Sequence, residues 1–126
     1  MESTAYAFDE FGGPLAPRAV PVPEPAGREV VVAVTHCGVC HSDLHFHEGH
    51  YDIGGGRQVR LAERGIVPPV TLGHEIVGTV LAAGPDAAGE VEAGRRYLVF
   101  PWIGCGACGA CADGAENLCE APRFLG

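Results

Sequence analysis

Four cysteines near the C-terminal end constrain this chain more than any other feature. They follow the spacing C-x2-C-x2-C-x7-C and are Cys105, Cys108, Cys111 and Cys119. Four thiolates this close in sequence can converge on one tetrahedral metal ion, and an all-cysteine ligand set is typical of structural zinc sites. Glycines among them, such as Gly106 and Gly109, allow the tight turns that bring sulfur atoms together. The pattern therefore predicts an irregular zinc-binding lobe over residues 104–119.

Two disulfide bonds are the alternative interpretation of these cysteines. The N-terminal segment lacks the basic start and apolar core of a signal peptide, and no apolar run is long enough to cross a bilayer. We therefore expect a cytoplasmic protein, whose reducing environment favours zinc over disulfides. The net charge of −8 argues against a nucleic acid or an anionic membrane as a partner.

The composition indicates one globular domain that is mainly β. The 126 residues suffice for a modest core, and 19 glycines and 10 prolines favour turns and strands over long helices. The β-branched segment Glu29–His36 is the clearest strand, and the proline-rich segment Pro14–Pro25 is expected to be an extended connector. Further strands are expected over Thr4–Phe8, Val70–Ala83, with interruptions at its glycines, and Arg96–Pro101. Many short strands with few helices predict a partly open β-barrel.

Two segments are expected to be loops. Cys37–His50 is polar and rich in histidine, with one helical turn starting at Ser42, and Tyr51–Pro69 has one helical turn near Leu61–Arg64. The chain shows no βαβ pattern. Its one G-x-G-x-x-G, which begins at Gly104, runs through the cysteines and lacks the following helix and the acidic residue about twenty positions later that a dinucleotide site needs.

A second group of metal-binding residue types lies earlier in the chain. Cys40 offers a thiolate and His74 an imidazole nitrogen, and a catalytic zinc typically takes three protein ligands and leaves a fourth position open. His74 and Glu75 are adjacent, so in a strand they would point to opposite faces. Both can reach one metal only if the backbone turns at Gly73. Glu75 is therefore the weaker ligand candidate.

Other residues of this segment have two interpretations. Cys37 and Cys40 could form a redox C-x-x-C, which would indicate a thiol redox protein, but no thioredoxin-like βαβ surrounds them, and Cys37 is expected to pack beside the site. His41 and His45 would share a face of a helix. Asp43 could cap that helix or hold a metal-bound histidine in one tautomer. The remaining histidines are expected to be solvated loop residues: His36, His47 and His50.

Three motifs occur together and in order, namely CGVCHSD, LGHEIVG and GCGACGACADGAENLC. On these motifs, which anchor residues 29–126, the chain resembles the N-terminal catalytic domain of the zinc-containing medium-chain alcohol dehydrogenases. The resemblance implies a GroES-like β-barrel, a separate Rossmann domain that binds NAD or NADP, and an alcohol or aldehyde substrate in the cleft between them. We therefore expect residues 1–126 to form an incomplete GroES-like N-terminal domain that includes the zinc lobe.

The same resemblance implies a role for each candidate residue. Ser42 would accept the proton of the substrate alcohol, and His45 would pass it towards solvent. Asp43 would hold a zinc-bound histidine, and His41 would lie near the cofactor pyrophosphate. The implied ligands are Cys40, His74 and the nearby or transient Glu75 for a catalytic zinc, and Cys105, Cys108, Cys111 and Cys119 for a structural zinc.

Two departures from the family pattern affect these expectations. The stretch between His45 and His74 is longer than in many members, which affects the rim of the substrate pocket. The chain also lacks a Rossmann domain, a further cysteine ligand and the returning part of the catalytic domain. We therefore expect a piece of an oxidoreductase that is homo-oligomeric at full length, or else a remnant that serves as a non-catalytic zinc-binding module.

Overall fold

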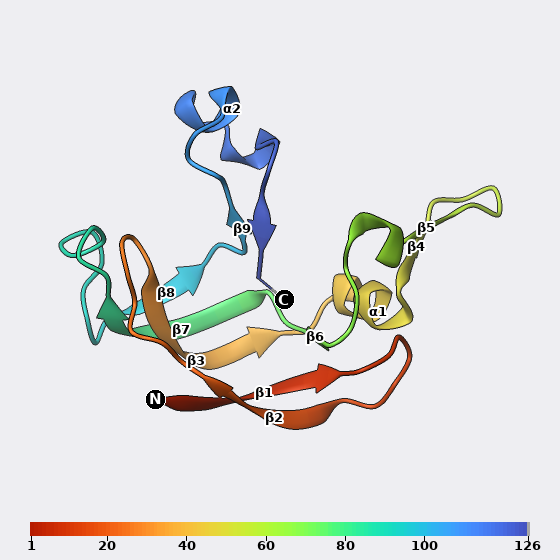
Figure 1. Ribbon diagram of the computed structural model, residues 1–126, viewed down its shortest axis with the longest axis horizontal. Helices are drawn as coiled ribbons and strands as arrows, with labels where there is room; N and C mark the ends of the chain where they lie inside the picture. The colour runs from red at the N-terminus through yellow and green to blue at the C-terminus, as the bar shows by residue number, and fades with distance from the viewer. Residues whose placement is uncertain (126) are drawn as a thin grey trace.

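A computed structural model describes residues 1–125, and their strands form separate small sheets that do not close into a barrel (Figure 1). One sheet has the order β2-β1-β6, and another has the order β3-β7-β8, with antiparallel pairing throughout both. Their strands are β1 (Glu2–Phe8), β2 (Ala16–Pro21), β3 (Val30–Gly38), β6 (Val70–Thr71), β7 (Glu75–Ala83) and β8 (Arg96–Val99). The expectation of a mainly β, partly open architecture is confirmed.

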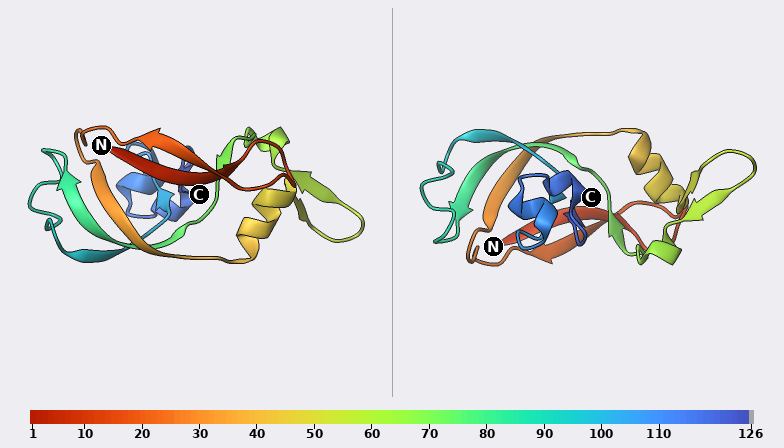
Figure 2. Two further views of the ribbon diagram at one scale, coloured as in Figure 1. Left: turned by 90° about the horizontal axis from the view of Figure 1, so that it is seen from below. Right: turned by 90° about the horizontal axis from the view of Figure 1, so that it is seen from above.

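The pairing of β3 with β7 is the longest ladder of the fold. It runs from Val30 opposite Ala83 to Gly38 opposite Glu75, and its register shifts at two irregularities along β3. A Cβ atom at Gly78 would overlap the side chain of Val32, so a glycine is needed where the two strands approach closely. Figure 2 shows the resulting curvature of these strands in two further views.

The proline-rich segment is more regular than the expected connector. Strand β2 pairs with β1 along its whole length, with Ala19 opposite Thr4. Pro17 and Pro21 have no N–H groups to donate. Because β2 is an edge strand, the absence of these groups does not weaken a central ladder. The expectation of a mere connector over Pro14–Pro25 was therefore wrong.

The expected loop Tyr51–Pro69 also contains more structure than its composition suggested. Strands β4 (His50–Asp52) and β5 (Gln58–Arg60) form a hairpin around three glycines, and a 3-10 turn follows at Ala62–Arg64. All three glycines have positive φ, which explains why GGG occurs at the tip. Downstream, the expected single strand Val70–Ala83 is divided into β6 and β7.

The core is small and includes the N-terminal hairpin. Phe8 and Leu61 are the largest fully buried side chains. The ring of Phe8 lies edge-on to His47 with 5.3 Å between ring centroids, and His47 Nε2 lies 2.7 Å from the Gly13 carbonyl oxygen. His47 belongs to helix α1 (His41–Glu48) and fastens it to the N-terminal hairpin. The expectation that His47 is a solvated loop residue was therefore wrong.

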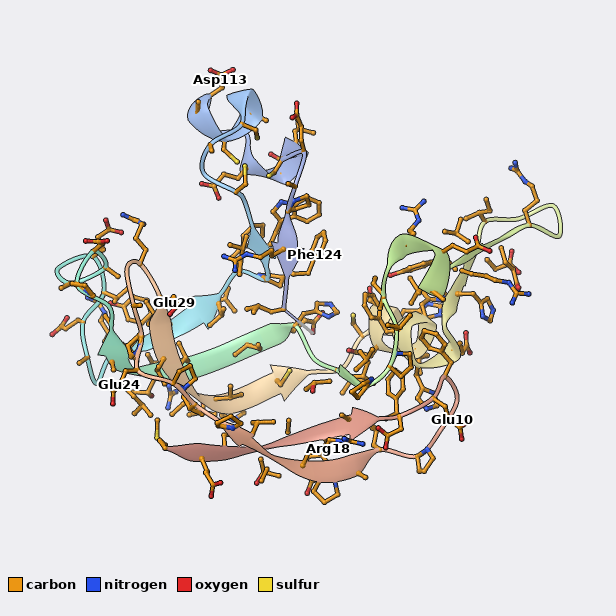
Figure 3. All side chains as sticks on the ribbon, in the orientation of Figure 1. Glu10, Arg18, Glu24, Glu29, Asp113 and Phe124 are labelled. Carbon is orange, nitrogen blue, oxygen red and sulfur yellow. The ribbon has the colours of Figure 1, made fainter. Side chains whose placement is uncertain are left out.

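The cysteine-rich lobe projects away from the sheets, with Asp113 near its tip and Phe124 near its base (Figures 1 and 3). At the base, Trp102 and Phe124 pack ring to edge at 4.6 Å, and Trp102 Nε1 donates a hydrogen bond of 2.8 Å to the Glu116 carbonyl. The lobe contains α2 (Gly109–Ala112) and the 3-10 turn Glu116–Leu118, and its base is formed by β9 (Trp102–Ile103) and β10 (Arg123–Phe124).

Residues 1–125 contain no βαβ unit, as expected from the sequence. None of their helices has the length and apolar character that a membrane span requires. The final residue of the expected domain, Gly126, lies outside the described part of the chain.

Candidate functional site

Helix α1 carries four of the candidate residues, namely His41, Ser42, Asp43 and His45. It begins at His41, one residue before the expected turn, and continues to Glu48. Its C-terminal end is fixed by Gly49, which has a φ of 82° and donates its N–H to the His45 carbonyl at 2.8 Å. The helix is therefore longer than the single turn predicted from the sequence, because both of its ends are fixed.

Asp43 joins the start of α1 to the segment before β7. Its side chain is only 7% exposed, and it accepts hydrogen bonds from the backbone N–H of Cys40 (2.8 Å) and of Gly73 (3.1 Å). Its Oδ1 atom also lies 3.9 Å from Nδ1 of His74. The sequence left open whether Asp43 caps the helix or holds a metal-bound histidine in one tautomer. The structure shows the cap and places the carboxylate near His74, and the hold on a metal-bound histidine stays a prediction. A buried carboxylate needs such partners to offset its desolvation.

The side chains of Cys40, His74 and Glu75 converge at this point. Cys40 Sγ lies 3.2 Å from His74 Nε2, and one ligand atom from each of the three residues lies within 4.8 Å of the others. A sulfur, an imidazole nitrogen and a carboxylate oxygen form a donor set that suits zinc. The weaker ligand candidate, Glu75, is therefore brought into the same group as the other two.

Two glycines make this convergence possible. Gly73 has a φ of 105°, which gives the turn that lets adjacent residues face one point. Gly38 lies opposite Glu75 in the β3–β7 ladder, and a Cβ atom at Gly38 would overlap the Glu75 carboxylate. The sequence analysis found Gly73 but missed Gly38, because the need for a missing Cβ there depends on the strand register.

A row of aromatic rings joins α1 to strand β4. The rings of His41 and His45 stack with centroids 4.5 Å apart, and the ring of Tyr51 lies 4.6 Å from that of His45. The shared helix face expected for the two histidines is confirmed. The Nδ1 atom of His45 is buried without a hydrogen-bond partner among the described residues. Ser42 lies one helical turn before His45.

The four C-terminal cysteines form a second convergent group. Their four Sγ atoms all lie within 4.8 Å of one another. Backbone N–H groups point at these sulfurs, including Cys105 N–H to Cys119 Sγ at 3.2 Å and Cys108 N–H to Cys105 Sγ at 3.3 Å. N–H donors stabilise thiolates, which are the form that binds metal. The residues present therefore fit a tetrahedral all-sulfur metal site.

The pKa values of these thiols diverge. Hydrogen bonds from the backbone of Glu120 and Cys111 lower the pKa of Cys108 to about 6. The pKa of Cys105 is also lowered, chiefly by the backbone N–H of Ala107. For Cys111, a backbone hydrogen bond at Gly106 lowers the pKa, but burial and the neighbouring thiols raise it to about 12 overall. The neighbouring thiols therefore do not all lose their protons in the same pH range.

All six cysteines are free thiols. Cys37 lies beside the site, as expected, but it is exposed, so the expectation that it is packed was wrong. The Sγ atom of Cys37 occupies the space next to Gly73. A Cβ atom added to Gly73 would lie only 2.6 Å from this sulfur. His36 is exposed on β3, and His50 is half-buried at the start of β4.

The chain belongs to the alcohol dehydrogenase GroES-like domain family, whose model matches residues 26–126. It is 40% identical over 122 residues to an NAD-dependent alcohol dehydrogenase from Saccharolobus solfataricus, and 39% identical to one from Sulfurisphaera tokodaii. Each alignment covers 97% of this chain but 34% of the relative. The chain thus spans about a third of the length of the curated relatives it matches.

Solved structures show the same relationship. The alcohol dehydrogenase of Aeropyrum pernix superposes with a TM-score of 0.79 at 31% identity, covering 98% of this chain and 33% of that one. The D-arabinose dehydrogenase of Sulfolobus solfataricus superposes with a TM-score of 0.76 at 28% identity, covering 100% and 34%. The fold expectation, a GroES-like architecture, is thereby confirmed.

Proposed function

We propose that this chain is the metal-binding catalytic portion of a zinc-dependent NAD or NADP alcohol or aldehyde oxidoreductase. The observation that carries this proposal is the convergence of Cys40, His74 and Glu75 beside a helix that presents Ser42 and His45. Family membership and NAD-dependent alcohol dehydrogenase relatives support the reaction class. Residues 1–126 would then be one GroES-like domain that includes the lobe 104–119.

Two zinc ions would have different roles. Cys105, Cys108, Cys111 and Cys119 would hold one in a closed shell that stabilises the lobe. The three-residue group at Cys40, His74 and Glu75 would hold the other and leave a position for substrate. Zinc in such an open site acts as a Lewis acid and lowers the pKa of a bound hydroxyl, for water from about 15.7 to about 7.

The remaining residues would move the proton and orient the reactants. Ser42 would accept the proton of the substrate hydroxyl, and His45 would take it from Ser42 and release it to solvent. Both side chains belong to α1, and His45 lies one helical turn after Ser42, which supports this route. The alcohol would lose this proton and a hydride to become a carbonyl, while the oxidised nicotinamide cofactor would be reduced.

Asp43 and His41 would contribute through position. Asp43 holds the start of α1 and the turn at Gly73 together, so it would keep Cys40 and His74 at a fixed separation. It also faces Nδ1 of His74, which would leave Nε2 free to bind metal. His41 is exposed and would lie near the cofactor pyrophosphate.

The test combines metal analysis with an alcohol oxidation assay of the enzyme that carries this chain together with a nicotinamide-binding domain. We expect one zinc at each cluster and turnover with either NAD or NADP. Cys40→Ala should lose the zinc of its site and the activity, and Ser42→Ala should keep both zinc ions while kcat falls about 100-fold or more. Undiminished turnover in Cys40→Ala would overturn the proposal.

A further inference from the structure

Tyr51 contacts the ring of His45 from a different element of the fold. Tyr51 belongs to β4 and is half-buried, whereas His45 belongs to α1. Their ring centroids lie 4.6 Å apart at an interplanar angle of 45°, and His41 stacks on the same imidazole at 4.5 Å and 15°. Tyr51 also lies edge-on to Phe46, at 6.4 Å and 88°. The imidazole of His45 is therefore held between its own helix and the β4–β5 hairpin.

These ring contacts matter because Nδ1 of His45 accepts or donates no hydrogen bond within residues 1–125. Its Nδ1 atom is enclosed and has no partner among the described residues. A histidine in a proton route is typically oriented by a hydrogen bond to its second ring nitrogen. Here the packing of two aromatic neighbours takes the place of that bond, since offset and tilted ring pairs have preferred geometries.

We propose that Tyr51 is a positioning residue for proton transfer, and that its ring, not its hydroxyl, holds His45 in the orientation needed to receive the proton from Ser42. The kinetic effect of Tyr51 rests on the proposed function. The contact between the rings of Tyr51 and His45 does not depend on that function. It also gives the β4–β5 hairpin a role, because that hairpin presents Tyr51 to α1.

The kinetic test uses the complete enzyme in saturating alcohol and cofactor. Tyr51→Ala should lower kcat about 2- to 10-fold, the range that corresponds to the coupling of one aromatic pair, with KM nearly unchanged. Tyr51→Phe keeps the ring and should retain most of kcat. The matched control is Tyr97→Ala, which truncates another half-buried tyrosine, on β8, and should leave kcat unchanged.

A double-mutant cycle identifies the residue through which Tyr51 acts. In a His45→Ala background, Tyr51→Ala should have no further effect on kcat. An equal additional loss in that background would overturn the proposal, as would a change confined to KM, which would indicate that Tyr51 lines the substrate pocket. A Tyr51→Phe variant as impaired as Tyr51→Ala would overturn it too, because the hydroxyl would then be the active group.

A measurement without catalysis separates this inference from the proposed function. In NMR spectra of the 126-residue chain with zinc, the ring protons of His45 should show an upfield ring-current shift that Tyr51→Ala removes and Tyr51→Phe preserves. Identical His45 spectra in all three proteins would overturn the positioning role. Ring-current shifts as expected in an inactive enzyme would instead count against the proposed function alone.

Discussion

Sγ of Cys40 and Nε2 of His74 lie 3.2 Å apart, although the two residues are separated by 34 positions in the sequence. Two elements create this proximity, the N-terminal end of α1 and the turn that precedes β7. Asp43 accepts a backbone hydrogen bond from each of them. The sulfur and the nitrogen are therefore brought together by the protein framework itself, and a metal ion would complete an arrangement that already exists.

Removal of zinc should disorder the lobe at residues 104–119 while the sheets keep their structure. Cys119 is the only buried hydrophobic residue described in this lobe, so metal binding would supply most of its folding free energy. Amide hydrogen exchange of the reduced chain, with and without chelator, measures this directly. Amides of the β3–β7 ladder serve as the internal control. A zinc-free, reduced chain whose lobe remains protected would contradict the prediction.

The reactivities of Cys108 and Cys111 should report whether the zinc-free lobe keeps its fold. In the folded lobe, backbone hydrogen bonds lower the pKa of Cys108 to about 6, and burial and the neighbouring thiols raise the pKa of Cys111 to about 12. Disorder of the lobe removes these contacts, so in the reduced, zinc-free chain iodoacetamide should alkylate both cysteines at similar rates, which fall as the pH drops below about 8.5. Both are half-buried in the folded lobe, which makes them a matched pair.

Mass spectrometry of peptides from a pH series of alkylated samples gives the two rates. Zinc should protect both cysteines at every pH tested. A Cys108 rate that exceeds the Cys111 rate more than about tenfold at pH 7, and that persists until the pH drops through about 6, would contradict the predicted disorder of the zinc-free lobe.

A chelator should empty the Cys40 site before it empties the four-cysteine site. The first group offers one thiolate, one imidazole and one carboxylate, whereas the second offers four thiolates with backbone N–H donors. More ligands, and softer ones, hold zinc more strongly. Titration with a chelator, followed by metal analysis, should therefore show two separate steps. A Cys40→Ala chain should lose only the first step, and simultaneous release of both ions would show that the ligand count is wrong.

Gly38→Ala should weaken zinc binding at Cys40 and His74 although it removes no ligand. The added Cβ atom would overlap the Glu75 carboxylate and displace it from the group. We expect a loss of affinity of about tenfold or more, similar to that of Glu75→Gln. Gly109→Ala is the control, because a Cβ atom there meets nothing within 4 Å. Zinc affinity unchanged in Gly38→Ala would show that Glu75 is not a ligand.

Local motifs in the sequence predicted which side chains converge in the two groups of candidate metal ligands, but they predicted much less of the long-range packing. The four-cysteine group and the pairing of Cys40 with His74 depend on spacing and residue type, which the sequence displays directly. Gly38 and His47 were missed or misjudged, because their roles depend on strand register and on contact with the N-terminal hairpin. The proline-rich strand β2 was mistaken for a connector, because the β-propensity of its residues does not reveal that it lies at the edge of a sheet, where prolines are tolerated.

The 126-residue chain alone should show no measurable hydride transfer. Its described residues contain no βαβ unit, and the only G-x-G-x-x-G motif lies in the four-cysteine lobe. Without a held cofactor, the chain lacks the advantage of proximity, worth up to about 7–11 kcal/mol of the barrier. Edge strand β8 also exposes Leu98, and Phe100 follows it, so the isolated chain should self-associate.

The assay incubates the purified chain with primary and secondary alcohols and either nicotinamide cofactor, and follows reduced cofactor by absorbance. A longer protein that adds a nicotinamide-binding domain is the positive control, and light scattering reports self-association. Turnover by the 126-residue chain that disappears in Cys40→Ala would refute the prediction, because the cofactor would then bind without a Rossmann domain. Turnover only in the longer protein would favour the role of this chain in an oxidoreductase. An independent zinc-binding module would instead be inactive both as the 126-residue chain and within the longer protein.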